Sequence, residues 1–216
     1  MPTPPSKQPK AAVTRNRILE TAAALFWRRS FHSVAMDELA QAAEVNKATI
    51  YRYFPDKASI AVAVARLNGE HIEAGVFAPA FANHTEPDAR LRAIYGSMLA
   101  NLRSIYTQDE DTYGCPLAGL TLELGREMPE LRRETAAIFA KIEQRLQQLA
   151  EDALARGAVS GWTSPALGRL LMQILHGAFV SSRLAATPGP FVDAANASLA
   201  LIGSAYRHDH LPGENQ

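Results

Sequence analysis

The chain has 216 residues, a mass of 23.5 kDa and equal numbers of basic and acidic residues, 22 of each. Its 47% apolar and 20% charged residues predict a folded globular protein and exclude a disordered or membrane-embedded chain. One cysteine excludes a disulfide framework and a multi-cysteine zinc site. Because the sequence shows neither a leader pattern nor a clean apolar run of about 18–20 residues, we expect a cytoplasmic location and no membrane partner.

Four helices are predicted in the first third of the chain, after an arm of residues 1–12 whose four prolines disfavour a helix. Apolar residues at spacings of three and four predict a first helix with Thr14 as its N-cap. A second helix is expected over 36–43, and a third follows the N-cap Asn46 and ends before Pro55. Asp56 caps a fourth helix, which reaches about residue 74.

A loop is predicted between Gly75 and Pro87, where the helical pattern loosens. Amphipathic helices are then expected over roughly 88–106, 116–126, 129–156, 164–185 and 190–206. Gly157 is a natural helix stop, and Ser164 followed by Pro165 predicts an N-cap and a first helical residue. Because strand-like alternation is missing, the predicted fold is all-α with about nine helices.

The second and third helices are short and joined by a few residues, as in a helix-turn-helix. A capped helix start presents backbone N–H groups and partial positive charge to phosphate, and Ala48 is small enough for close approach to a groove. Polar, basic and aromatic side chains suited to a recognition helix fill its first two turns: Lys47, Thr49, Tyr51 and Tyr53. Lys57 starts the next helix, where a phosphate can lie.

Charge agrees with a polyanionic partner for the N-terminal part alone. Residues 1–66 hold ten basic and five acidic side chains, whereas residues 67–216 hold twelve basic and seventeen acidic ones. A chance surface distribution accounts for this small excess equally well.

The stretch from Ile18 to Ile60 resembles the DNA-binding domain of the tetracycline-repressor (TetR) family. Its most specific block is Val45–Lys57, in which the aromatic spacing, Phe54 and the final lysine fall in the family's places. The resemblance implies that Lys57 binds phosphate and that Ile50 and Phe54 are core residues. The predicted DNA-binding set is Asn46, Lys47, Ala48, Thr49, Tyr51, Tyr53 and Lys57.

Two residues depart from the family pattern. Glu44 replaces the usual glycine of the turn, and Ser30 replaces the glycine that usually ends the first helix. If these positions keep a positive φ, each side chain costs about 1 kcal/mol.

A second resemblance, to LmrA/YxaF-like TetR repressors, rests on Tyr113–Leu117, Leu122–Leu124 and Pro129–Arg132. The family resemblance implies a C-terminal domain that binds a small molecule and a second copy of the chain. We therefore divide the chain into a flexible arm (1–12), a helix-turn-helix DNA-binding domain (13–58), a ligand-binding and dimerisation domain (59–208) and a flexible tail (209–216).

The C-terminal apolar faces supply the candidates for effector and partner contacts, although each also fits a simple core. The effector set is Tyr95, Met98, Leu102, Cys115, Phe139, Met172, His176 and Phe179. The dimer set is Arg183, Ala195, Leu199, Ile202 and Tyr206. Cys115 fits either a redox sensor or inert packing, and His176 either an effector contact or a satisfied core histidine.

Motifs of catalysis are missing, including a nucleophile elbow, a phosphate-cradling glycine loop and His-Glu-x-x-His, so we expect no enzyme, cofactor or metal site. The triplet His208–His210 is expected to be a solvated tail. The predicted function is a ligand-responsive transcriptional regulator, a homodimeric repressor that a small-molecule effector releases from a palindromic double-stranded DNA operator. Two alternatives remain open: a helical adaptor whose helix-turn-helix contacts protein, and a helical enzyme.

Overall fold

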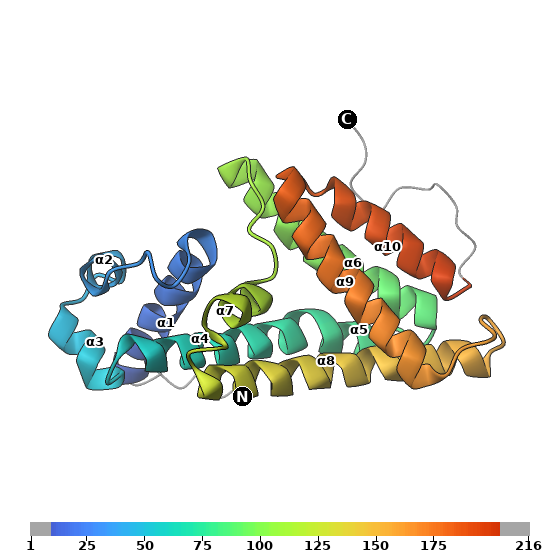
Figure 1. Cartoon of the computed structure of the whole chain (residues 1–216), viewed down its shortest axis with the longest axis horizontal. Coiled ribbons are helices and arrows are strands. Elements are labelled where there is room, and N and C mark those ends of the chain that lie inside the picture. The colour runs from blue at the N-terminus through green and yellow to red at the C-terminus, as the bar shows by residue number, and fades with distance from the viewer. Residues whose placement is uncertain (1–9, 204–216) are drawn as a thin grey trace, which may run out of the picture. The chain divides into compact units, whose positions relative to one another are not determined.

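The computed structural model describes residues 10–203, and all regular secondary structure in this part of the chain is helical, with ten α-helices and one π-helical turn (Figure 1). The all-α prediction is therefore confirmed. The expected nine helices are obtained when the uninterrupted helical stretch 57–83 is counted as one. The chain forms two compact units: residues up to 68 with 116–135, and residues 69–115 with those from 136 onward.

The first unit is built around α1 (Lys10–Arg29), which packs against α2 (Met36–Ala42), α3 (Lys47–Tyr53) and α7 (Pro116–Leu124). Most of α4 (Lys57–Ile72) and the start of α8 (Pro129–Ala155) also belong to it. Its core contains fully buried apolar side chains from successive helices: Ile18, Ala22, Leu39, Ile50 and Ile60. Burial of Ile50 and Phe54, at 0% and 4% exposure, confirms the two core residues that the family resemblance implies.

Local signals fix two of the predicted helix starts and fail at two others. Asn46 caps α3 by accepting a 2.7 Å hydrogen bond from the Thr49 N–H, and Asp56 accepts a similar bond from Ser59 N–H. Thr14 is not a cap, because the helix already begins by Lys10 and the Thr14 hydroxyl donates to the Lys10 carbonyl. Residues 10–12, expected in the arm, are thus helical, while residues 1–9 lie outside the described residues.

At the start of α9 (Ser164–Ala185) the cap is one residue earlier than expected. Thr163 has extended backbone geometry and accepts from the Ala166 N–H, which leaves Ser164 as the first helical residue.

Both residues that depart from the family's glycines adopt left-handed backbone geometry. Ser30 has a φ of 77° and Glu44 a φ of 52°, and the Ser30 N–H still bonds to the Phe26 carbonyl at the end of α1. A Cβ atom is disfavoured in this region of backbone space, so each residue carries local strain.

We therefore expect Glu44→Gly to raise the free energy of unfolding of the first unit by about 1 kcal/mol. The exposed Arg17–Glu44 ion pair, 3.7 Å long, offsets little of this gain. Denaturant unfolding followed by circular dichroism measures the change. Glu20→Gly inside the right-handed helix α1 is the control and should destabilise by a similar amount; a loss of stability in both variants would contradict the strain.

The predicted loop between Gly75 and Pro87 is wrong, because this segment is mostly helical. A π turn (η1, Glu73–Phe77) continues α4 and leads directly into α5 (Ala78–Asn83). The Ala78 N–H bonds to the Glu73 carbonyl, five residues back, and Pro79 lies in the first turn of α5, where its missing N–H is tolerated. Buried Phe77 and Ala80 hold the segment to the core.

The second unit contains α6 (Pro87–Asp109), the rest of α8, α9 and α10 (Gly189–Leu201). Helices α9 and α10 lie side by side, and α10 also packs on α6 (Figure 1). Their inward faces form one apolar core with η1 and α8. Among residues 10–203, none of the helices is both long and apolar enough to cross a bilayer.

Candidate functional site

Helix α3 presents one face to solvent and one to the core. Ile50 points inward and is fully buried, while its neighbour Tyr51 is 47% exposed. Asn46, Lys47 and Ala48 are exposed as well, and Thr49 and Tyr53 are half-buried. The structure therefore brings the predicted residues of α3 together on one short helix, with the polar and aromatic groups outermost.

The cap of α3 also orients Thr49. The Asn46 side-chain oxygen accepts from both the Thr49 N–H at 2.7 Å and the Thr49 hydroxyl at 2.8 Å. The Thr49 hydroxyl proton is used in the bond to Asn46, so toward DNA the Thr49 hydroxyl can act only as an acceptor. The amide N–H₂ of Asn46 stays available for a phosphate oxygen.

Lys47 is held by an ion pair within the first unit. Its ammonium lies 2.8 Å from a carboxylate oxygen of Asp37, in the first turn of α2. The hydrogen bond that Lys47 donates to Asp37 raises the pKa of Lys47. The acidic partner was missed from the sequence, since it lies ten residues away on another helix.

We expect Asp37→Asn to strengthen DNA binding about threefold to fivefold. The slope of log affinity against log salt concentration should become steeper by the equivalent of about one phosphate contact. The substitution frees the Lys47 ammonium and removes a negative charge beside it. Fluorescence anisotropy with labelled duplex over a salt series measures both quantities. Glu20→Gln, which removes one charge from an exposed position of α1, should change neither; equal gains in the two variants would show a general charge effect.

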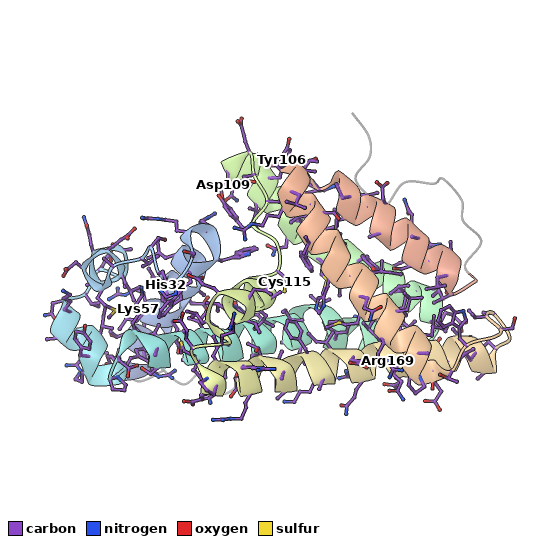
Figure 2. The ribbon with its side chains drawn as sticks, in the orientation of Figure 1. His32, Lys57, Tyr106, Asp109, Cys115 and Arg169 are labelled. Atoms are coloured by element: carbon purple, nitrogen blue, oxygen red, sulfur yellow. The ribbon has the colours of Figure 1, made fainter. Side chains whose placement is uncertain are left out.

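Lys57, the implied phosphate ligand, is engaged inside the unit (Figure 2). Its ammonium donates to the Phe31 carbonyl and lies 4.2 Å from the centroid of the Phe31 ring. Burial lowers the pKa of Lys57, although the charge of Glu123 acts in the opposite direction. The bond to Phe31 uses one of its three N–H donors, and the DNA contact of Lys57 stays a prediction.

A further exposed cation on α3 was missed. Arg52 places its guanidinium 5.0 Å from the centroid of the Tyr53 ring. Arg52 is a basic residue that directly follows Tyr51, and this position in the sequence could have placed it in the predicted DNA-binding set.

The predicted effector residues gather in and around the core of the second unit. Tyr95, Leu102 and Met172 are core members, and Met98, Phe139 and Phe179 pack against that core from half-buried positions. Tyr95 has a structural role: its hydroxyl lies 2.8 Å from the Ser198 hydroxyl on α10, and burial raises its pKa to about 12.

His176 differs from the other candidates because its polar atom is not satisfied. Its ring meets Phe139 edge-on, with centroids 5.0 Å apart, and its Nε2 is buried without a hydrogen-bond partner in the part of the chain described. Burial lowers the pKa of His176 and favours the neutral ring. Cys115 is half-buried at the end of the segment that links α6 and α7.

That linking segment is tied to α9. The Thr112 hydroxyl donates to the Ser182 carbonyl at 2.8 Å, and the Arg183 guanidinium donates to the Tyr113 carbonyl at 3.0 Å. Gly114, with a φ of 74°, lies against the Arg183 side chain. Arg183, predicted at the dimer interface, is exposed yet bonded within its own chain.

Three predicted dimer residues need correction. Ala195, Leu199 and Ile202 are 0–3% exposed and belong to the core of their own unit. The apolar stripe of the last helix is its inward face, so it cannot cover a partner. Tyr206 lies outside the described residues.

Apolar surface is found instead on α9, where Val180 is 54% and Leu184 is 84% exposed one turn apart. Small exposed residues, Ala197 and Ala200, occupy the outer face of α10.

Two family models match the chain. Residues 18–64 match "Bacterial regulatory proteins, tetR family", and residues 92–197 match "Transcriptional regulator LmrA/YxaF-like, C-terminal domain". A curated relative, the HTH-type transcriptional activator FasR of Mycolicibacterium smegmatis, is 33% identical over 79 residues; the match spans 37% of this chain and only 36% of that relative.

Solved structures support the fold over most of the chain. A TetR-family regulator from Agrobacterium tumefaciens superposes with a TM-score of 0.77 and 22% identity, covering 88% of this chain and 98% of its own. A TetR regulator from Chloroflexus aurantiacus gives a TM-score of 0.74 and 25% identity, covering 89% and 96% respectively. The two matching models and this shared architecture establish that the chain belongs to the TetR family of DNA-binding transcriptional regulators, a family without enzymatic activity, and carries an LmrA/YxaF-like C-terminal domain.

Proposed function

We propose that this protein is a homodimeric repressor, acting in the cytoplasm, that leaves a palindromic operator when a small molecule binds its C-terminal domain. The observation that carries the proposal is the outward face of α3, with exposed Lys47, Ala48 and Tyr51 beside a fully buried Ile50. A capped helix with this division is suited to the major groove. The proposed division of labour assigns DNA to residues 13–58 and ligand and partner to 59–208.

Dimerisation is supported by the exposed apolar pair Val180 and Leu184 on α9. The outer face of α10, with Ala197 and Ala200, permits close approach of another helix. Two-fold pairing of these helices repeats each contact and requires an operator with two matching half-sites.

Effector binding is supported by the aromatic and sulfur-containing side chains around His176. Its unsatisfied Nε2 offers one hydrogen bond to a ligand that is otherwise apolar. An effector that binds one arrangement of the helices more tightly than the other shifts the protein toward that arrangement. A coupling free energy of about 1–3 kcal/mol between the effector site and the DNA site would change operator affinity roughly 5- to 150-fold.

Helix α4 is the proposed connection between the two functions. It is a continuous helix, with residues up to 68 in the first unit and the rest in the second. Because α4 moves as a rigid helix, a displacement of its C-terminal end also moves its N-terminal end at Lys57, next to the recognition helix in the chain.

Selection from a pool of randomised duplexes tests the proposal directly. The full chain should retain duplexes that share two inverted half-sites, and a reporter placed behind such a site should be silenced. Failure to retain any duplex at low salt would end the DNA-binding proposal and favour an adaptor that binds protein. Increased reporter output would instead indicate an activator, as the name of the relative FasR says of that protein.

A further inference from the structure

Helix α7 holds the loop between α1 and α2 through a single carboxylate. The two oxygens of Glu123 accept from consecutive backbone N–H groups, from Phe31 at 3.0 Å and from His32 at 2.9 Å. These donors precede Glu123 by about ninety residues in the chain. The interaction therefore joins the helix-turn-helix to a helix outside it, within the first unit.

The loop is shaped to receive an anion. Ser30, at a φ of 77°, ends α1 and turns the chain away from the helix axis. The N–H groups of Phe31 and His32 then both bond to the Glu123 carboxylate. Both backbone polar groups of Phe31 are bonded: its N–H donates to Glu123, and its carbonyl accepts from the Lys57 ammonium. The Phe31 side chain is 9% exposed and packs edge-on against Phe26.

This arrangement connects four helices to one short loop. The loop follows α1 and precedes α2 in the chain. Glu123 fixes the loop to α7, and Lys57 fixes the loop to α4. Since α3 packs on α1 and α2, the place of the loop helps to decide where the recognition helix stands. Helix α7 itself begins directly after Cys115, the end of the segment that Thr112 and Arg183 tie to α9.

We propose that Glu123 is a positioning residue for DNA reading, which fixes the α1–α2 loop, and with it α2 and α3, to helix α7. The inference rests on the proposed DNA binding and adds a residue that touches no DNA. Without the carboxylate, the loop gains freedom that binding must remove again, so operator affinity falls while the helices stay folded.

The test compares Glu123→Gln with Glu127→Gln in the full chain. Glutamine keeps one acceptor but turns an N–H₂ group toward a second N–H donor, whereas Glu127 is exposed just beyond α7 and serves as the matched control. Three measurements are made on each: hydrogen exchange at the Phe31 and His32 amides, thermal unfolding, and affinity for a duplex selected by the unchanged protein.

In Glu123→Gln we expect exchange at these two amides to speed up at least tenfold relative to α3, and operator affinity to fall about tenfold. Glu127→Gln should leave both within a factor of two. Glu123→Asp keeps the carboxylate on a shorter side chain and should give an intermediate loss of operator affinity. If Glu123→Gln unfolds, the exchange and affinity of Glu123→Asp test the proposal in its place.

Two results would overturn the inference. Unchanged exchange would show that Glu123 does not hold the loop, and unchanged affinity despite faster exchange would show that the loop does not position the reading helix. Both leave the proposed function intact, whereas failure of the unchanged protein to bind any selected duplex would overturn the two proposals together.

Discussion

Tyr51→Ala is expected to weaken operator binding about 10- to 100-fold, as loss of a well-placed groove contact does. Tyr51 is the large exposed aromatic of α3 at 47% exposure, and the inward Ile50 carries the packing of the helix. Truncation should therefore leave helicity and association unchanged. Titration of the selected duplex by fluorescence anisotropy measures the loss.

Tyr106→Ala is the matched control for this substitution. Tyr106 is 39% exposed on α6, in the second unit, so its removal should leave DNA affinity unaltered (Figure 2). If Tyr51→Ala and Lys47→Ala both bind as the unchanged protein does, α3 is not the reading helix.

Leu184→Glu is expected to raise the dimer dissociation constant at least about 100-fold. The side chain is 84% exposed in the single chain, so a charge there is harmless until a partner covers it. Two-fold symmetry would then bury two unpaired carboxylates, at a cost of about 3–5 kcal/mol. Analytical ultracentrifugation over a concentration series detects the resulting monomer.

The comparison variant is Leu122→Glu, at a leucine that is 81% exposed on α7, in the first unit. It should sediment as the unchanged protein does. Dimers of normal stability in Leu184→Glu would move the interface away from α9. Loss of the dimer should also weaken operator binding, because each half-site is then bound separately.

Features that depend on a few neighbouring residues could be predicted from the sequence. The Asn46 and Asp56 caps and the helical stop at Gly157 each follow from local backbone chemistry, and the structure confirms them. The left-handed geometry of Ser30 and Glu44 could be expected only from the glycines that the family has at these positions. Most residues of the predicted DNA-binding set lie on a single seven-residue helix, so the sequence could place them together, while their contacts with DNA stay a prediction.

Features that depend on distant residues could not. An apolar stripe shows that a helix has a buried face but not whether its own chain or a partner covers it, which is why Ala195, Leu199 and Ile202 were misassigned. Likewise, no spacing in the sequence indicates that Lys57 meets Phe31 or that Lys47 meets Asp37. The effector set shares the difficulty, because core and ligand cavity use the same side chains.

The π turn at Glu73–Phe77 has a consequence for the ancestry of this segment. A π turn amounts to one extra residue within an α-helix, and its wider turn absorbs that residue without changing which side the following residues face. Removing Gly75, whose position has open space around it, should therefore restore regular α-helix and leave Phe77 and Ala80 facing the core. Homologues one codon shorter here are expected to keep apolar residues at the positions that correspond to Phe77 and Ala80.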